Sequence, residues 1–300
     1  MKTSNKVIDR IPNLPEQKRA LLYYLVDQLS RIPGLAAIVL GGSYAAGTQH
    51  EGSDLDLGLY YSEANPFSIA DVQRIAQNVS IKAPATVTSF YEWGAWVNGG
   101  AWIHTQEGKV DFLYRNLDQV QRTIDEAQQG IIHHDYDQQP TYGFYSVIYL
   151  AETQICLPLF DLGKLISKLK TQVEIYPARL KRKMIDETLW SAEFALLHAR
   201  PFAARGDIYN TVGCLTRILS NLTQALFALN DRYFMSDKKV LDTIAIFPKV
   251  PRGYIQQINH LLGCPGSTAP ELIQTVSNLE QVWHSVVSLT GELYQPRFQV

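Results

Sequence analysis

The chain has 300 residues, of which 46% are hydrophobic and 19% charged, with a formal net charge of −2 and a pI near 6.4. This length and hydrophobic content suffice for one large or two ordinary domains with sizeable cores, and we expect two. Binding to long nucleic acids is dominated by basic charge, and this chain has no basic surplus. A long polynucleotide partner is therefore disfavoured.

The cysteines and the apolar runs indicate the cellular compartment of the protein. Cys156, Cys214 and Cys264 are odd in number and far apart, without the paired spacing of metal ligands, which favours neither a disulfide framework nor a zinc site. Residues 1–17 lack the apolar core of a signal peptide, and no window approaches about 18 consecutive apolar residues. We therefore predict a cytoplasmic protein that is neither exported nor membrane-spanning.

The first predicted elements are a helix and a strand. Apolar residues recur at helical spacing over residues 15–32, which predicts an amphipathic helix ending before Pro33 and Gly34. An apolar run of strand length follows over residues 36–40, and the helix should pack on it. Gly41, Gly42 and Ser43 end this strand. Glycine lets the backbone turn or approach a ligand closely, so the N–H groups here suit a phosphate, although such a turn is more often a plain loop.

The second apolar run contains two aspartates. Asp54 and Asp56 are two residues apart, so in a strand both carboxylates project from one face while Leu55 and Leu57 point to the other. Aspartate is depleted from strands and neighbouring carboxylates repel each other, so the pair needs a cation. Mg²⁺ commonly takes one or two carboxylates together with substrate phosphates, which is what this arrangement offers.

Further short elements complete the first part of the chain. A helix is predicted from Pro66 or Ser68 to about residue 79, followed by strands over residues 85–91, 101–105 and 110–114. The last two strands form a hairpin, and Asp111 opens the second of them. This order of elements predicts a small mixed sheet with helices on one side.

Together the motifs resemble the signature of the DNA polymerase beta-like nucleotidyltransferase superfamily, in which a Gly-Ser loop precedes an Asp-x-Asp metal pair. The matching stretches are Leu40-Gly41-Gly42-Ser43 and Ser53-Asp54-Leu55-Asp56-Leu57. That family has a third carboxylate on a later strand, and Asp111 is the candidate. The resemblance implies that Asp54, Asp56 and Asp111 are catalytic and hold two Mg²⁺ ions. It also implies that Gly41, Gly42 and Ser43 hold the triphosphate of an NTP.

Beyond residue 116 the apolar pattern is helical almost throughout, and no strand is predicted. The expected helices cover residues 117–129, 141–155, 162–173, 177–198, 207–234, 237–247, 251–262 and 270–293. The loop at residues 131–140 is the expected junction, so we predict a nucleotidyltransferase core domain over 1–130 and a helical domain over 131–300. The predicted fold class is α+β, a small mixed sheet with helices followed by an all-α bundle.

A helical bundle after such a core resembles the small-molecule branch of the superfamily, including the aminoglycoside adenylyltransferases. In that branch the site lies in the cleft between the domains, and an Arg and a following Lys of the second domain reach the triphosphate. Arg217 and Lys238 are similar in order, at a longer separation. For Lys238 a solvated helix start is slightly favoured over phosphate binding. For Arg217 a structural salt bridge is an equal alternative, with Asp186, Glu187 or Glu193 as the partner.

Two further clusters are weaker candidates. His133 and His134 lie close to Asp135 and Asp137, but adjacent histidines point apart in most backbone states, so a metal site is disfavoured. A group of aromatic residues is either core packing or a stacking wall for a base or an acceptor ring. Its members are Tyr91, Trp93, Trp96 and Trp102.

We therefore predict an enzyme of EC 2.7.7 type that transfers NMP, AMP from ATP in the first instance, to a hydroxyl group of a small molecule or protein. The chemistry is a two-Mg²⁺ in-line displacement, in which Asp111 is the proton acceptor by resemblance. The alternative is a nucleotide-binding regulatory or antitoxin-like protein that acts on a protein partner. The acceptor and the base preference stay open, and the helical half leaves surface for a homodimer.

Overall fold

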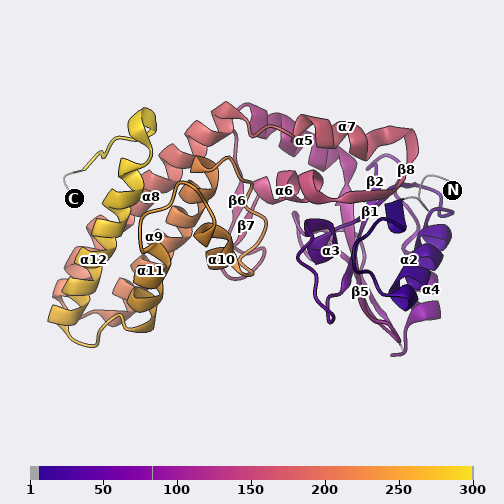
Figure 1. Cartoon of the computed structure of the whole chain (residues 1–300), viewed down its shortest axis with the longest axis horizontal. Helices are drawn as coiled ribbons and strands as arrows, with labels where there is room; N and C mark the ends of the chain where they lie inside the picture. The colour runs from indigo at the N-terminus through magenta and orange to yellow at the C-terminus, as the bar shows by residue number, and fades with distance from the viewer. Residues whose placement is uncertain (1–6, 83, 299–300) are drawn as a thin grey trace. The chain divides into compact units, whose positions relative to one another are not determined.

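The computed structural model describes residues 7–82 and 84–298. Its elements are labelled in Figure 1. In chain order they are α2 (Glu16–Leu29), β1 (Leu35–Leu40), α3 (Gly42–Ala46), β2 (Leu55–Tyr61), α4 (Ile69–Val79), β3 (Thr86–Val87), β4 (Gly100–Thr105), β5 (Gly108–Asn116), α5 (Leu117–Gln128), β6 (His134–Asp135), β7 (Phe144–Tyr145), α6 (Val147–Ile155), β8 (Leu157–Asp161), η1 (Leu162–Lys164), α7 (Leu165–Gln172), α8 (Ala178–Ala204), α9 (Ile208–Leu229), α10 (Val240–Ala245), α11 (Tyr254–Gly263), α12 (Ala269–Ser288) and η2 (Gly291–Leu293). The predicted α+β class is confirmed.

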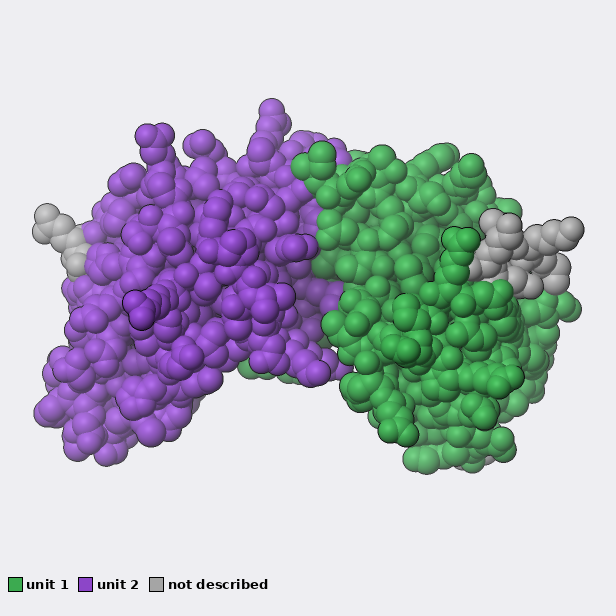
Figure 2. Space-filling view, viewed as in Figure 1, with its two compact units in different colours: residues 1–125, 133–175 green, residues 126–132, 176–300 purple. Residues whose placement is uncertain are grey.

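The chain forms two compact units, which Figure 2 separates by colour. Unit 1 consists of Met1–Asp125 and His133–Ile175, and unit 2 of Glu126–Ile132 and Tyr176–Val300. The structure therefore divides the chain differently from the predicted boundary between residues 130 and 131, because a large part of the predicted helical domain folds with the sheet.

One strand accounts for much of that difference, and it corrects the prediction that no strand follows residue 116. β8 pairs antiparallel with β1 and forms an edge of the sheet. It is five residues long and contains Pro158. Proline cannot donate to a strand ladder, so it is confined to edge strands, and the same proline removes the strand signal from the sequence. The predicted helix over 141–155 likewise starts later, because β7 pairs with β6 before α6 begins.

The six-stranded sheet of unit 1 has the order β3-β4-β5-β2-β1-β8. β2 and β5 run parallel, and every other neighbouring pair is antiparallel. The predicted hairpin of residues 101–114 is the pair β4 and β5. The parallel pair places Asp56 directly beside Asp111.

Helices α2 and α4 cover one face of this sheet (Figure 1). Their apolar side chains, such as Leu25 and Ile75, join Leu57 of β2 and Phe112 of β5 in one buried cluster. Side chains alternate along a strand, so burial of Leu57 and Phe112 turns their neighbours Asp56 and Asp111 to the opposite face. The prediction that the first helix packs against β1 is confirmed, because residues of α2 and β1 belong to the same buried cluster.

The opposite face is covered at one end by α6. There Arg115 of β5 is buried against Tyr149 and Glu152, so this end of the face is closed by protein. Arg115 and Asp111 are four residues apart on β5 and share a face. Asp56 and Asp111 thus lie nearer the starts of β2 and β5, before the part of this face where Arg115 contacts α6.

Unit 2 is helical, and its core is formed by α8, α9 and α12, which pack on one another. Among the described residues, α9 is the one helix long and apolar enough to cross a membrane by length and composition. In this structure 67% of that apolar stretch is buried. The apolar composition of α9 is thus accounted for by burial in a helical core. α9 ends at Leu229, earlier than the predicted residue 234, and Tyr233 and Phe234 are buried outside the helix.

Candidate functional site

The glycine turn after β1 is held directly against β2. The backbone N–H of Gly41 donates a hydrogen bond of 2.8 Å to the carbonyl oxygen of Asp56, which continues the pairing of the two strands. Gly42 has a positive φ of +56°, the left-handed region that glycine adopts readily. A Cβ atom added to Gly42 would lie 1.8 Å from Oδ2 of Asp56. The Asp56 carboxylate therefore lies on the backbone of Gly42, in space that only glycine leaves free.

Asp56 and Asp111 form the acidic pair of the site. They are register partners on parallel strands, whose backbones are about 4.8 Å apart. Both side chains are half-buried. Asp54 also is half-buried and precedes the first residue of β2. The structure thus brings two of the three predicted carboxylates side by side and places the third just before the same strand.

The segment that carries Asp54 is anchored by a lysine that the sequence analysis did not single out. Lys18 of α2 is buried, and its Nζ donates a 2.6 Å hydrogen bond to the carbonyl oxygen of Ser53. The same Nζ lies 5.8 Å from the centroid of the Tyr44 ring. Because Ser53 directly precedes Asp54, this bond holds the backbone from which Asp54 projects.

The acidic pair offers the oxygen donors that a hard cation takes, but it is not a complete cage. Within residues 7–82 and 84–298, no group of three Asp, Glu, His or Cys side chains has the geometry of a metal cluster. Asp54 therefore does not complete a cluster with Asp56 and Asp111 in this structure. Two carboxylates together with phosphate oxygens are a common ligand set for Mg²⁺. The pair therefore fits a cation that binds together with a nucleotide.

The region around His133 and His134 also has no such cluster. The His134 ring stacks on Tyr145 at a centroid distance of 3.9 Å, and its Nε2 lies 2.7 Å from the carbonyl oxygen of Tyr142. These contacts give the histidine a packing role in the small β6–β7 hairpin.

The predicted aromatic group divides into two parts. Trp96 packs against Phe144 and Tyr149. Trp102 of β4 is the register partner of Asp111 and stacks on Trp93 with a centroid distance of 4.7 Å and an interplanar angle of 22°. The second part therefore lies beside the acidic pair, on the same face of the sheet.

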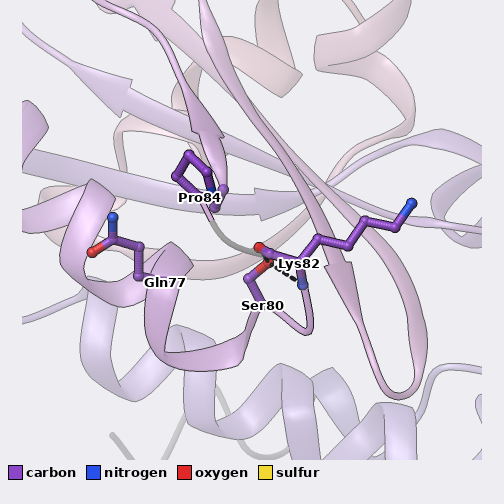
Figure 3. A pocket seen from close by; sticks show the side chains of 5 residues that line it. Gln77, Ser80, Lys82 and Pro84 are labelled. Carbon is purple, nitrogen blue, oxygen red and sulfur yellow. Dashed lines mark hydrogen bonds between the residues drawn. The ribbon is translucent and has the colours of Figure 1, made fainter.

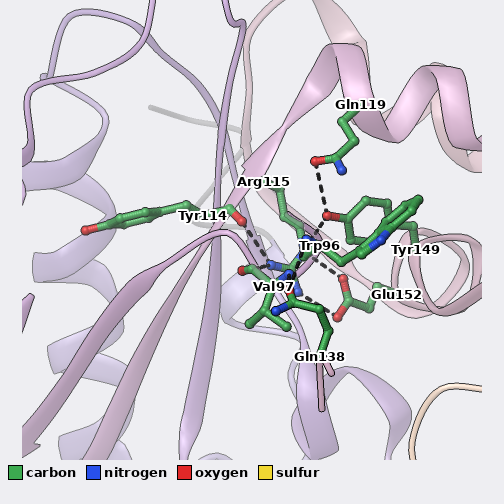
Figure 4. A network of polar contacts seen from close by, with 8 residues as sticks. All are labelled: Trp96, Val97, Tyr114, Arg115, Gln119, Gln138, Tyr149 and Glu152. Atoms are coloured by element: carbon green, nitrogen blue, oxygen red, sulfur yellow. Dashed lines mark hydrogen bonds and ion pairs between the residues drawn. The ribbon is translucent and has the colours of Figure 1, made fainter. Parts of the chain in front are cut away.

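Arg115 forms a polar network at the closed end of this face, as Figure 4 shows. Its guanidinium makes two hydrogen bonds of 2.8 Å to the carboxylate of Glu152 and one of 2.9 Å to the carbonyl oxygen of Tyr114. Burial lowers the pKa of Arg115, but the charge and hydrogen bonds of Glu152 outweigh it and hold this pKa above its ordinary value. The pair fixes α6 on the sheet. No sequence signal links these residues, which are 37 positions apart.

Arg217 and Lys238 belong to unit 2, and both side chains are exposed. Arg217 lies on α9 and forms no ion pair with another described residue. The three carboxylates considered as its salt-bridge partners bind elsewhere: Asp186 to Arg297, Glu187 to Lys183, and Glu193 to backbone N–H groups near the C-terminus. A structural salt bridge of Arg217 to these carboxylates is therefore not formed.

Two hollows of the surface lie away from the acidic pair. One, of about 410 Å³, is lined by residues at the end of α4 and the start of β3, including Gln77, Ser80 and Lys82 (Figure 3). The other, of about 640 Å³, lies in unit 2 and is lined by Arg179, Arg182 and Lys183 among others. Neither of these two hollows is lined by a predicted site residue.

Comparisons with known proteins agree with this geometry. Residues 22–92 match the family model "Nucleotidyltransferase domain". The match contains Gly41, Gly42, Ser43, Asp54 and Asp56 and ends before Asp111. Residues 149–238 match "Domain of unknown function (DUF4037)", a stretch that extends from α6 of unit 1 into unit 2.

Among solved structures, the chain resembles a nucleotidyltransferase-like protein from Exiguobacterium sibiricum 255-15. The two share 12% sequence identity with a TM-score of 0.46, over 92% of this chain and 78% of the other. Comparison with curated proteins finds no match.

The family match covers the turn and the first two aspartates. The Gly-Gly-Ser turn and the Asp-x-Asp strand lie inside the matched stretch, and the fold places them in contact. Residues 22–92 are therefore similar to a nucleotidyltransferase domain.

Proposed function

We propose that this protein is a metal-dependent nucleotidyltransferase that moves AMP from ATP to a hydroxyl group of a small molecule or a protein. The observation that carries the proposal is the alignment of Gly42, Asp56 and Asp111 on three adjacent segments. The carboxylate of Asp56 lies on the backbone of Gly42 and beside Asp111. Two half-buried carboxylates on neighbouring strands repel each other, and a bound cation would offset that repulsion.

Each residue has a distinct role in the proposed reaction. The backbone of Gly42 and the side chain of Ser43 bind the triphosphate, while Gly41, whose N–H donates to the carbonyl oxygen of Asp56, holds this turn against β2. Asp54, Asp56 and Asp111 supply the oxygen ligands for Mg²⁺. Bound Mg²⁺ would lower the pKa of an attacking hydroxyl and neutralise the charge that develops on the leaving pyrophosphate. Asp111 accepts the proton of the hydroxyl, as the resemblance implies. Asp54 is the third proposed ligand, on a segment that the hydrogen bond from Lys18 anchors at Ser53.

Other expectations belong to the same proposal. We propose Arg217 and Lys238 as further residues that bind the triphosphate, as the resemblance to the small-molecule branch implies. We further propose that two Mg²⁺ ions take part, that ATP is the preferred NTP and that the protein works in the cytoplasm. A homodimer is compatible with the same chemistry.

The test is label transfer from ATP that carries ³²P at the α-phosphorus. The wild-type protein is incubated with Mg²⁺ and a panel of aminoglycosides, lincosamides, tRNA and cell lysate, and the labelled species is identified. Asp56→Asn and Asp111→Asn should each abolish labelling and leave the thermal unfolding transition nearly unchanged. Asp125→Asn, an exposed aspartate of α5, is the matched control and should keep full activity.

The outcomes separate the proposed enzyme from its alternative. Removal of Mg²⁺ by a chelator should stop labelling of every acceptor. Full labelling by Asp56→Asn would contradict the assigned role of the acidic pair. Binding of ATP without labelling of any acceptor, together with capture of a protein partner, would favour the regulatory or antitoxin-like alternative.

A further inference from the structure

Trp102, which stacks on the half-buried Trp93 beside Asp111, is unusually exposed for its size. Trp102 has 53% of its surface exposed, although it lies in the middle of a six-residue strand. Its neighbours on β4, Ala101 and Ile103, are buried on the other face. The exposed indole therefore belongs to the face that carries the acidic pair. An aromatic surface of this size next to polar groups is typical of a ligand contact.

Gly100 lets both β5 and Trp93 come close to the backbone of β4. A Cβ atom on Gly100 would lie 1.8 Å from the carbonyl oxygen of Phe112 and 3.0 Å from the Trp93 ring. Gly100 and Trp102 are two residues apart on the strand and share a face. Trp93 therefore lies over the strand at Gly100 and stacks on Trp102 from there.

The loop that carries Trp93 is fixed by hydrogen bonds. The backbone N–H of Trp93 donates to the carbonyl oxygen of Asn98 at 3.0 Å, and the carbonyl oxygen of Trp93 accepts from Nε2 of Gln138 at 3.1 Å. Oε1 of Gln138 accepts from the backbone N–H of Trp96 and of Val97. The two rings are thus held in place before any ligand binds, which reduces the ordering cost of binding.

We propose that Trp102, supported by Trp93, is the acceptor subsite, and that it binds a planar aromatic group carried by the hydroxyl compound. This inference rests on the proposed nucleotidyl transfer, whose acceptor it narrows to a chemical class. The ring of the acceptor continues the stack of the two indoles, and its hydroxyl lies toward Asp111.

The order of residues across the sheet places the acceptor on this side. From the β1 turn outward the row is Gly42, Asp56, Asp111 and Trp102, on successive neighbouring segments. Trp102 is two strands from Asp56, a distance of about 10 Å between backbones. In an in-line displacement the attacking and leaving oxygens lie on opposite sides of the phosphorus. With the triphosphate tail at Gly42, the attacking hydroxyl comes from the side of Trp102.

Charges of both signs lie near the tryptophans. Asp111 is the register partner of Trp102, and His104 and Lys109 are register partners in the next row of the same face. Stacking of a neutral planar ring on Trp102 does not depend on the sign of these charges, so the exposed indole favours an aromatic acceptor.

The proposed step is balanced within the reactants. The hydroxyl oxygen of the aromatic acceptor attacks the α-phosphorus of ATP, and a new oxygen–phosphorus bond forms. The bond from that phosphorus to the bridging oxygen breaks, and pyrophosphate leaves with the electron pair. The hydroxyl proton passes to the carboxylate of Asp111. The products are the adenylylated acceptor and pyrophosphate.

The test compares Trp102→Ala and Trp102→Phe with the wild-type protein. The probes are tyrosine amide and benzyl alcohol, which carry a ring, and serine amide, which does not. Probe binding is measured by calorimetry without ATP, ATP binding is measured with Mg²⁺, and transfer is measured with labelled ATP. Trp190→Ala is the matched control, because Trp190 is an exposed tryptophan stacked on Phe194 in unit 2.

The expected result is binding of both aromatic probes but not of serine amide. Trp102→Ala should weaken aromatic binding by about tenfold or more, as loss of one stacking contact does, and leave ATP affinity unchanged. Trp102→Phe should restore most of the affinity, and Trp190→Ala should match the wild type.

Three results would overturn the inference: no binding of either aromatic probe, equal use of serine amide, or a loss of ATP affinity in Trp102→Ala. The last would assign the stack to the nucleobase. Failure of the proposed nucleotidyl transfer would give a different experimental result. In that case the aromatic probes still bind at Trp102, but no label is transferred to any acceptor.

Discussion

The contact between Gly42 and Asp56 makes a decisive prediction about the site. In Gly42→Ala the new Cβ would lie 1.8 Å from Oδ2 of Asp56, whereas real Cβ contacts are almost never shorter than 3.0 Å. The carboxylate must therefore move by at least about 1.2 Å. A misplacement of about 1 Å in a catalytic group can cost about 100-fold in rate. We expect a loss of label transfer of that order.

The same substitution strains the backbone, and a matched variant isolates that cost. Gly47 has a φ of +70°, close to the +56° of Gly42, but a Cβ atom at Gly47 would have no atom within 4 Å. An L-residue in this left-handed region costs about 1–2 kcal/mol. Gly42→Ala and Gly47→Ala should thus lower the unfolding temperature by similar amounts, about 2–4 °C per kcal/mol for a unit of this size.

The two variants should differ in function although they are alike in stability. Thermal unfolding and transfer of ³²P-labelled AMP are measured on both, together with calorimetric binding of Mg²⁺ and ATP. Gly47→Ala should keep near-normal activity, and Gly42→Ala should lose it. If both variants keep activity, the present position of the Asp56 carboxylate is not needed for the reaction, and the reasoning from this contact is refuted.

Three other predictions follow from buried groups. Arg115→Met leaves Glu152 without its buried partner and should cost about 3 kcal/mol in the free energy of unfolding, measured by urea denaturation; a cost below about 0.5 kcal/mol contradicts the role of the pair. Glu193→Ala removes the acceptor of the buried Tyr294 hydroxyl and of the backbone N–H groups of Arg297 and Phe298, and should cost about 2 kcal/mol in the free energy of unfolding, measured by urea denaturation; an unchanged free energy of unfolding would count against this contact. Burial raises the pKa of Cys156 to about 11, and only the thiolate reacts, so at pH 8 a thiol reagent should label exposed Cys264 first. Equal labelling rates would contradict the burial.

Local patterns predicted most of the elements of unit 1. The helical spacing over residues 15–32 appears as α2, and the alternation around Asp56 appears as β2. The period of two along a strand also predicted that Asp56 projects from the face opposite to Leu55 and Leu57. These features depend on residues close together in the chain, so the sequence contains them directly.

Features that depend on distant residues were missed or placed wrongly. β8 forms because β1 offers an open edge, and its own residues, with Pro158, give no strand signal. The division into units follows from β8 and α6 packing on the sheet, and not from the composition of the loop at 131–140. The partnership of Arg115 and Glu152 likewise has no local signature.

By itself the sequence determined which groups are present for the proposed site: a glycine turn, two aspartates two residues apart and a third aspartate on a later strand. Only the tertiary structure decided which of these groups meet. It placed the Asp56 carboxylate on Gly42, paired Asp56 with Asp111, and put Trp102 in the next position of the row. The physical reason is that side-chain alternation is local, whereas strand order and register are set by the burial of a shared core.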